Sequence, residues 1–343
     1  MSSKFRVREG DFLETVSGLI FDVKGLLHPP DRAIAYLRYL PDRRGNRRRA
    51  GVRYRKVYSL ETRASLLARR WPQYLYADPV FHREVQAVLL SEVRRDYVPT
   101  DGLEGLKHQS QRNSLEQHTV DLAETIVKET GISSAKVGVS GSILAGLHTP
   151  RSDIDLILYG AEASRRCHSS LKDLLEARAA GLTPHETGDL RKLYKQRELA
   201  TAMTFRDFVR HERSKVLQGK FRGTHYFIRC VKEWSEFEEA YGDKQYYPAR
   251  RALVHATVAN DDDSIFTPCT YQISDVKVIR GEERHVPTQI TSFRGRFCEQ
   301  ARRGDRVAAE GLLERVVDKD GEEYRLLIGE AAQDRLMVAE RRE

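Results

Sequence analysis

The stretch that decides the fold spans residues 141–156 and reads GSILAGLHTPRSDIDL. A short apolar run at residues 137–140 precedes it, so the pattern predicts a buried strand followed by a helical turn. A glycine at that junction, Gly141, lets the backbone approach a phosphate closely, and the next N–H groups can point at the anion. The Ser142 hydroxyl adds a donor, and Gly146 permits a second close approach. The stretch therefore predicts a phosphate-binding turn.

The same stretch ends in two acids, Asp153 and Asp155, on a predicted strand that runs to residue 159. Side chains alternate along a strand, so both carboxylates leave one face, about 7 Å apart at the backbone. Such a pair can hold Mg²⁺, which prefers oxygen ligands and keeps waters and substrate phosphates. Two ions about 3.5–4 Å apart would activate an attacking hydroxyl and neutralise a leaving pyrophosphate. The intervening apolar residues pack into the sheet: Ile154, Leu156 and Leu158.

The Gly-Ser pair, the loop with an internal glycine and the Ser-Asp-x-Asp sequence together resemble the signature of the DNA polymerase β-type nucleotidyltransferase superfamily. The whole chain is also similar to an uncharacterised archaeal group of predicted nucleotidyltransferases, through residues 265–269 and the long N-terminal region. The resemblance implies an NTP donor, with ATP expected, and Mg²⁺ as cofactor with two ions bound. The site residues that it implies are the catalytic metal ligands Asp153 and Asp155 and the phosphate-binding residues Gly141, Ser142 and Ser152.

Members of this superfamily usually supply a third carboxylate from a neighbouring strand. The predicted strand over residues 224–231 offers His225 and Arg229 on one face, and no acid before Glu233. His225 can take a proton or bind a metal, although a partly exposed histidine at a strand end is the simpler interpretation. Other acids lie on predicted helices or in a loop: Asp189, Glu198, Asp207 and Asp261 to Asp263. The third acid is thus not identified from the sequence.

Further basic residues lie near the motif or downstream of it. His148 and Arg151 fall in the loop between the motif halves, where either contacts the triphosphate or faces solvent. Lys192, Lys195 and Arg197 lie on a predicted helix, where they either add phosphate contacts or form ordinary helical surface charge.

The charge of the chain is strongly basic. Its 343 residues carry a formal net charge of +8, which favours an acidic partner such as nucleic acid. Residues 43–56 concentrate this charge without an intervening acid, and we expect them at the exposed tip or flank of a hairpin. They either bind RNA or form a solvated loop. The basic residues are Arg43, Arg44, Arg47, Arg48, Arg49, Arg53, Arg55 and Lys56.

Targeting and cysteine patterns favour a cytoplasmic protein without a membrane partner. No apolar run approaches the ~20 residues that a membrane helix needs, and the N-terminus lacks an apolar signal region. The cysteines are scattered and form no C-x-x-C pair, so we expect buried free thiols: Cys167, Cys230, Cys269 and Cys298.

The length and patterning predict an α+β protein in three regions. Residues 1–108 form a basic α+β region, with strands over residues 33–40 and 52–58 and helices over 59–70 and 80–94. Residues 109–240 form the nucleotidyltransferase domain, a mixed sheet with helices that include residues 189–211. Residues 241–343 contain closely spaced short strands, which suggest a small β-barrel.

Three functions follow from these patterns. The first is Mg²⁺-dependent transfer of a nucleotidyl group from an NTP to an RNA, protein or small-molecule acceptor. The second is a non-catalytic nucleic-acid-binding protein with a degenerate nucleotidyltransferase fold that lacks the third acid. The third, weaker one is an assembly subunit that binds protein partners.

Overall fold

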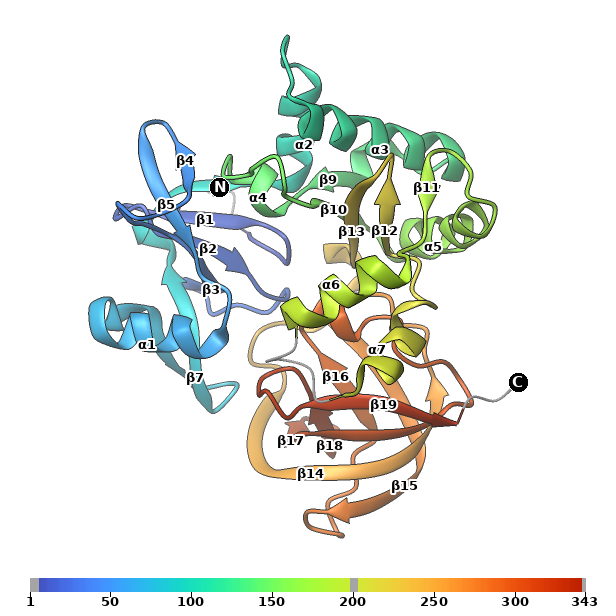
Figure 1. Ribbon diagram of the computed structural model, residues 1–343. Coiled ribbons are helices and arrows are strands. Elements are labelled where there is room, and N and C mark those ends of the chain that lie inside the picture. The colour runs from blue at the N-terminus through green and yellow to red at the C-terminus, as the bar shows by residue number, and fades with distance from the viewer. Residues whose placement is uncertain (1–5, 198–202, 341–343) are drawn as a thin grey trace. The chain divides into compact units, whose positions relative to one another are not determined.

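The computed structural model describes residues 6–197 and 203–340 (Figure 1), and the fold is mixed α+β as predicted. Contacts group the chain into two compact units. The first unit joins three segments, Met1–Asp78, Glu84–Thr183 and Gly219–Tyr241. The second joins Pro79–Arg83, Pro184–Gln218 and Gly242–Glu343. The N-terminal strands and the motif stretch therefore belong to one unit, and the three-region boundaries stay predictions.

The N-terminal strands of the first unit form a sheet in the order β4-β5-β3-β2-β1-β8, to which β7 and β6 are added through β3. Helix α1 (Leu60–Arg70) begins at Ser59, whose side chain accepts a hydrogen bond from the Thr62 N–H. The predicted strands over residues 33–40 and 52–58 and the helix over 59–70 are confirmed. The strands are β1 (Phe12–Thr15), β2 (Ile20–Val23), β3 (Arg32–Pro41), β4 (Arg47–Arg49), β5 (Val52–Lys56), β6 (Leu75–Asp78), β7 (Arg83–Leu89) and β8 (Val93–Tyr97).

The helix predicted over residues 80–94 is wrong. These residues form β7 and the start of β8, and the Gln86 side chain in β7 accepts a hydrogen bond from the Leu37 N–H in β3. A short apolar run does not distinguish a buried helix from a buried strand. Pairing with β3, which lies far away in the sequence, makes it a strand.

The second sheet of this unit carries the two motif acids and has the order β11-β12-β13-β10-β9. Strand β10 pairs with β13 in parallel and with β9 antiparallel, and every residue of β10 except Asp155 is buried. Helices α2, α3 and α5 accompany this sheet (Figure 1). The elements are α2 (Pro99–Lys107), α3 (Ser114–Thr130), β9 (Val137–Val139), α4 (Gly141–Leu144), β10 (Ile154–Tyr159), α5 (Ala161–Glu176), β11 (Leu182–Thr183), β12 (Gln218–Phe221) and β13 (Thr224–Val231).

The second unit is built on long antiparallel strands. The short strands expected from residue 253 to residue 279 are parts of β14 and β15. Pairing runs β14-β15-β16-β18-β17, and β17 pairs back to β14. The helix predicted over 189–211 is two helices, α6 (Thr187–Arg197) and α7 (Phe205–Glu212), and residues 198–202 between them are outside the described residues. The strands are β14 (Gln245–Asn260), β15 (Cys269–Arg280), β16 (Gln289–Ser292), β17 (Arg306–Asp318), β18 (Gly321–Leu327) and β19 (Arg335–Glu340).

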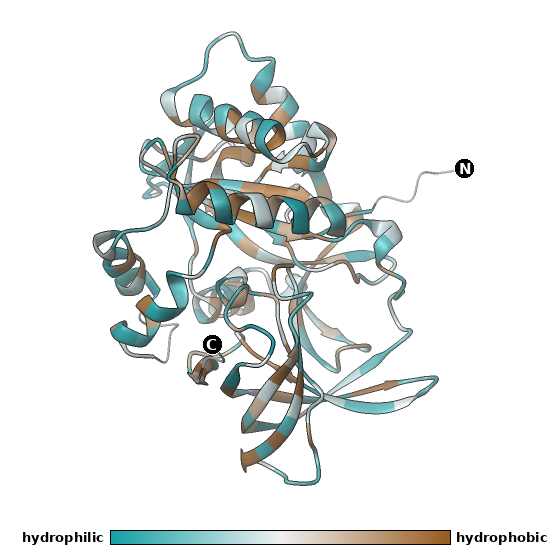
Figure 2. Ribbon diagram, turned by 90° about the vertical axis from the view of Figure 1, so that its right-hand side faces the viewer, coloured by the Kyte–Doolittle hydropathy of each residue, from teal (hydrophilic) through white to brown (hydrophobic). Residues whose placement is uncertain are grey.

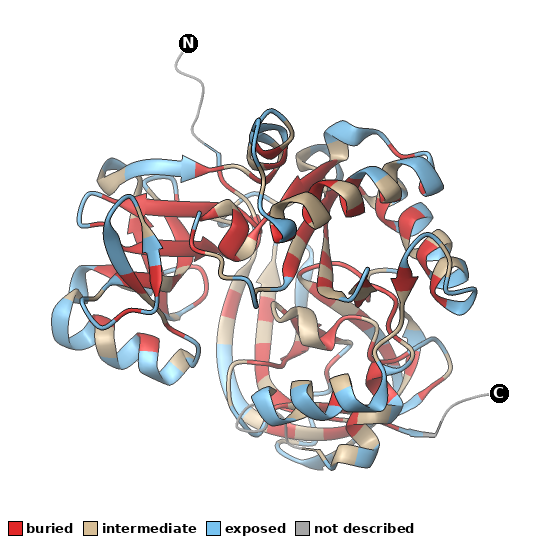
Figure 3. Ribbon diagram, turned by 45° about the horizontal axis from the view of Figure 1, so that its top comes forward, coloured by how far each residue is buried: buried red, intermediate tan, exposed pale blue. Residues whose placement is uncertain are grey.

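Burial follows the hydropathy pattern in both units (Figures 2 and 3). The buried residues of helix α5 recur every three or four positions and form one face: Ser164, Cys167, Leu171 and Leu175. Exposed positions lie on the other faces of the helices (Figure 3). All four cysteines are buried and free, as expected. None of the described helices is long and apolar enough to cross a membrane.

Candidate active site

The Gly141 turn lies directly against one of the motif acids. Gly141 begins α4 with a φ of +62°, in the left-handed region that favours glycine. A Cβ placed on it would lie 1.9 Å from Oδ2 of Asp155. The Asp155 backbone carbonyl also accepts a hydrogen bond from the Ser140 N–H at 2.8 Å. Only glycine therefore lets the turn and the carboxylate come so close together.

The two acids differ in exposure. Asp155 is half-buried inside β10, whereas Asp153 is exposed one residue before that strand begins. Ile154 between them is fully buried, so the strand alternates as predicted. The Asp155 carboxylate therefore lies beside the Gly141 turn, and the placement of both carboxylates on one face stays a prediction.

The loop between the motif halves is closed by its own hydrogen bonds. The Ser152 hydroxyl accepts from the Thr149 N–H at 2.9 Å, and the Ser152 N–H donates to the Thr149 carbonyl at 2.9 Å. Arg151 is exposed at the tip of this loop, and Ser142 is buried in α4. Ser152 thus shapes the turn immediately before Asp153, and its predicted contact with phosphate stays a prediction.

The His148 side chain contacts residues at the start of α3. Its Nε2 lies 3.0 Å from the Asn113 amide nitrogen and 3.5 Å from a Glu116 carboxylate oxygen. Burial lowers the pKa of His148 in spite of the Glu116 charge, which favours the protonated form. Asn113 and Glu116 form the capping box of α3, so His148 packs against the N-terminal cap of this helix.

The strand beside the acids carries no carboxylate at the expected position. In β13, Phe227 lies opposite Asp155 and Arg229 lies opposite Ile157, while half-buried His225 occupies the preceding alternate position. The Arg229 guanidinium pairs with the Glu9 carboxylate at 2.5 Å. Within residues 6–197 and 203–340, no group of three or more histidine, cysteine or acidic side chains could hold a metal ion. The third acid is thus missing from the described structure as well as from the sequence pattern.

The remaining sequence candidates lie in the second unit. Arg197 pairs with the buried Glu212 at 3.3 Å, which gives it a structural partner. Glu198 is outside the described residues. The other members of this group are Asp189, Lys192 and Lys195 in α6, Asp207 in α7, and Asp261, Asp262 and Asp263 after β14.

Sequence reasoning missed the part that the N-terminal sheet plays at the motif. One face of that sheet packs its apolar residues against the segment that follows the Gly141 turn. Phe12, Ile20 and Tyr39 share a core with Ala145 and Leu147. This contact could not be read from the chain, because no local pattern pairs residues so far apart.

Two arginines of β4 hold the motif loop from this face. The Arg47 guanidinium is buried and donates to the Leu147 carbonyl at 2.5 Å and to the Ser152 hydroxyl at 3.4 Å. The Arg49 guanidinium donates to the Ala145 carbonyl at 2.9 Å. The loop carbonyls, which have no helical partner, are thereby satisfied from another sheet.

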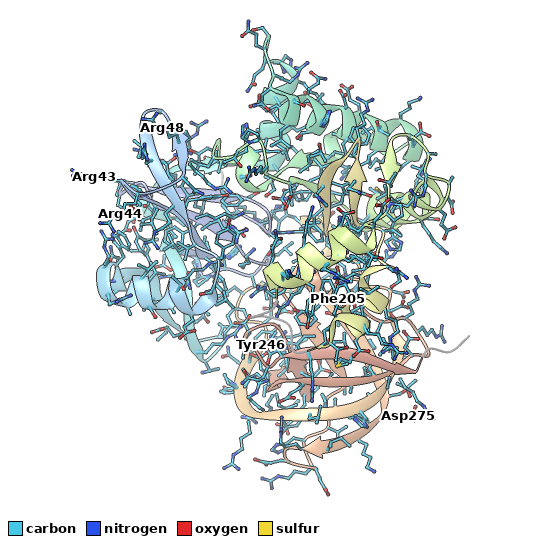
Figure 4. All side chains as sticks on the ribbon, viewed as in Figure 1. Arg43, Arg44, Arg48, Phe205, Tyr246 and Asp275 are labelled. Carbon is cyan, nitrogen blue, oxygen red and sulfur yellow. The ribbon has the colours of Figure 1, made fainter. Side chains whose placement is uncertain are left out.

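The expectation that the basic stretch is an exposed hairpin tip is wrong for these two residues. Side chains alternate along β4, so Arg47 and Arg49 face the motif while Arg48 faces solvent. Arg43 and Arg44 are also exposed, and Figure 4 shows them with Arg48 at the outer edge of the N-terminal sheet. The stretch therefore contains two anchors of the site and a separate exposed basic edge.

We expect Arg47→Met to lower the free energy of unfolding by about 2–3 kcal/mol, because a buried carbonyl loses a charged donor. Arg48→Met, one residue away on the opposite face, is expected to change it by less than about 0.5 kcal/mol. Urea unfolding followed by tryptophan fluorescence measures both. Equal effects of the two substitutions would contradict the anchoring role of Arg47.

Comparisons with known proteins agree with this geometry. Residues 120–216 match a family model described as a nucleotidyltransferase domain. The chain is 30% identical over 337 residues to the uncharacterized protein MJ1086 of Methanocaldococcus jannaschii, which covers 94% of this chain and 95% of that protein. This chain belongs to the polymerase β-type nucleotidyltransferases. No solved structure gives a significant match to this nucleotidyltransferase.

The donor set of this nucleotidyltransferase fits a divalent metal ion. Asp153 and Asp155 offer carboxylate oxygens two residues apart in the chain, and Gly141 leaves room for the Asp155 carboxylate beside the turn. Mg²⁺ is commonly held by one or two carboxylates, with waters and substrate phosphates completing six ligands. A second ion would depend more on the nucleotide phosphates, because the described residues offer no third carboxylate at the site.

Proposed function

We propose that this nucleotidyltransferase moves a nucleotidyl group from an NTP, with ATP as the expected donor, in a Mg²⁺-dependent reaction. The observation that carries the proposal is the contact between the Gly141 turn and the Asp155 carboxylate. It brings a phosphate-binding backbone and a metal-binding acid to one point. Asp153 and Asp155 would hold Mg²⁺, and Gly141 and Ser142 would hold the donor phosphates.

Nucleotidyl transfer requires one bond exchange at the donor. An acceptor oxygen forms a bond to the α-phosphorus while the bond to the leaving pyrophosphate breaks, and the acceptor proton passes to a base. Bound Mg²⁺ would stabilise the charge on the pyrophosphate. His225 lies in β13, which pairs with β10, and it precedes the residue opposite Ile154. It is the proposed proton acceptor, because β13 contains no carboxylate. The acceptor is an RNA, a protein or a small molecule with a free hydroxyl or phosphate.

The test incubates the protein with α-labelled ATP, GTP, CTP or UTP, Mg²⁺ and separate pools of RNA, protein and small-molecule acceptors. We expect label in one pool together with release of pyrophosphate, and loss of both when EDTA removes the metal. Asp153→Asn is expected to lower the rate at least about a hundred-fold, since a charged metal ligand is lost. Equal labelling by the wild-type protein and this variant would overturn the proposed site.

A second candidate function is nucleic-acid binding without catalysis. Two observations favour it. The place of the third acid is taken by Phe227 and His225, and Arg43, Arg44 and Arg48 are exposed together. Phosphate contacts weaken steeply as salt rises. Salt-dependent RNA binding that disappears in an Arg43→Glu, Arg44→Glu, Arg48→Glu variant, without labelling of any acceptor, would favour this function over transfer.

We also infer that the C-terminal strands form a small closed β-barrel. The support is that β17 pairs with both β18 and β14, so that the ladder of β14, β15, β16, β18 and β17 returns to its first strand. Closure removes exposed strand edges, which would otherwise invite pairing with other chains.

A further inference from the structure

A β-bulge in the N-terminal sheet turns two consecutive polar residues toward the motif acids. Ile20 pairs with Tyr39 but the next residue, Phe21, pairs with Leu37, so Arg38 is the extra residue. Leu37 and Leu40 both belong to the core on the opposite face, whereas Tyr39 belongs to the core that contains the motif loop. Arg38 and Tyr39 therefore share the face that meets the motif, where regular alternation would separate them.

Lys56 joins these residues from the neighbouring strand. It pairs with Tyr39 across β3 and β5, and it is half-buried. Burial is the main cause that lowers the pKa of Lys56 to about 8, and the Arg38 charge acts in the same direction. The carboxylates of Asp155 and Asp153 oppose this shift. Since Lys56 lies directly opposite Tyr39, which packs against Ala145 and Leu147 of the motif loop, it belongs to the face that meets the motif.

The cations on this face lack direct ion pairs. Among the described residues, no ion pair joins Lys56 or Arg38 to a carboxylate, although the Arg38 charge helps to lower the pKa of the buried Asp22. The Lys56 ammonium lies 5.0 Å from the centre of the Tyr58 ring. The Tyr39 hydroxyl is fully buried and has no hydrogen-bond partner in the described structure. Burial raises the pKa of Tyr39 to about 12, and the charges of Arg38, Arg47, Asp155 and Asp22 act on it as well. A buried hydroxyl without a hydrogen-bond partner requires an explanation, and an ion or water that completes its hydrogen bonds is one.

We propose that Lys56 and Arg38 bind the polyphosphate of the nucleotide, so that the N-terminal sheet forms the second wall of the nucleotidyltransferase site. This inference rests on the proposed function, because it takes the nucleotide to be an NTP held through Asp153 and Asp155. The phosphates that share a metal ion with these acids must lie near them, and Lys56 and Arg38 lie on the face of the N-terminal sheet that packs against the motif loop. A polyanion also offsets the cost of keeping two cations half-buried without ion pairs.

The same geometry predicts that removing the Lys56 charge changes the affinity for the metal alone and the affinity for the metal–nucleotide complex in opposite directions. Without a nucleotide, a divalent ion at Asp153 and Asp155 is repelled by the nearby Lys56 and Arg38 charges. When a nucleotide is bound, its phosphates lie between the metal ion and the two side-chain cations, and they attract the metal ion, Lys56 and Arg38. Removing the Lys56 charge should therefore strengthen binding of the metal alone and weaken binding of the metal–nucleotide complex. A side chain with a purely structural role would not produce this reversal.

Calorimetry with the full chain tests this inference, using Mn²⁺ alone, AMP, and a non-hydrolysable ATP analogue with Mg²⁺. Lys56→Met is expected to weaken binding of the analogue by about ten- to a hundred-fold, to change AMP binding far less, and to tighten Mn²⁺ binding by about three- to ten-fold. Lys56→Arg should restore most of the analogue affinity, and Lys128→Met, at an exposed position of α3, should leave all three unchanged. Thermal unfolding confirms that each variant is folded.

Two outcomes would overturn the inference while leaving the proposed function intact. One is wild-type binding of the analogue that Lys56→Met does not weaken. The other is that Lys56→Met weakens binding of the analogue and of AMP equally. Since AMP lacks the β- and γ-phosphates, this result would show that Lys56 does not bind the polyphosphate. Failure of the wild-type protein to bind any nucleotide with Mg²⁺ would instead overturn the proposed function itself.

Discussion

Asp155→Asn is expected to lower the rate of nucleotidyl transfer by at least about a thousand-fold, equivalent to about 4 kcal/mol in the activation barrier. The amide keeps the shape of the carboxylate beside the Gly141 turn, so the fold should accept it. It removes the negative charge that would hold Mg²⁺, and a neutral amide is a weaker ligand for a hard cation. The measurement is the single-turnover rate with saturating labelled ATP.

The stability of this variant supplies the control. Asp153 and Asp155 are like charges two residues apart in the chain, and removing one of them relieves repulsion. We therefore expect the melting temperature of Asp155→Asn to stay the same or to rise slightly, while its stabilisation by Mg²⁺ is lost. Asp101→Asn, at an exposed acid in α2, should leave both the rate and the metal effect unchanged. A wild-type rate in Asp155→Asn would exclude Asp155 from the reaction.

Gly141→Ala is expected to reduce both the stability of the protein and its proposed nucleotidyl-transfer activity. Its φ of +62° costs an alanine about 1–2 kcal/mol. The added Cβ would also lie 1.9 Å from Oδ2 of Asp155, so either the turn or the carboxylate must move. We expect a loss of about 2–4 kcal/mol in the free energy of unfolding and a rate at least about a hundred-fold lower. Urea unfolding and the labelled-ATP assay measure the two effects.

Gly223→Ala separates strain from contact. Gly223 lies in the turn before β13 with a φ of +83°, but no atom lies within 4 Å of the place where its Cβ would be. It therefore shares the backbone strain of Gly141 without the collision. We expect Gly223→Ala to lose only the strain energy and to keep the wild-type rate. If the two alanine variants were equally active, the contact between Gly141 and Asp155 would have no part in catalysis.

The motif itself was predictable because its information is local. The Gly-Ser pair, the strand over residues 154–159 and the Asp-x-Asp spacing all follow from neighbours a few positions apart. The structure places Gly141 against Asp155, within the same short stretch of chain. The roles of these residues in phosphate and metal binding stay predictions, since geometry alone does not measure binding.

The burial of individual residues in the basic stretch, residues 43–56, could not be predicted from the sequence. Composition indicated an arginine-rich hairpin, and the hairpin of β4 and β5 is present. Composition does not say which face of a strand is buried, so Arg47 and Arg48 looked equivalent. Arg47 is buried because it meets the Leu147 carbonyl, 100 residues later in the chain. That contact exists only once two separate sheets have packed together.

The sequence by itself determined the family, the Gly141 turn and the pair of acids, because each depends on the order and spacing of adjacent residues. The tertiary structure alone decided what surrounds them. It placed Arg38, Tyr39 and Lys56 on the face that meets the acids, through a bulge and a strand pairing that no periodicity reveals. It also set Phe227 opposite Asp155 on β13, a neighbouring strand of the kind from which members of the superfamily usually supply a third carboxylate. These features depend on contacts between distant segments, which form when burial of apolar surface brings the segments together.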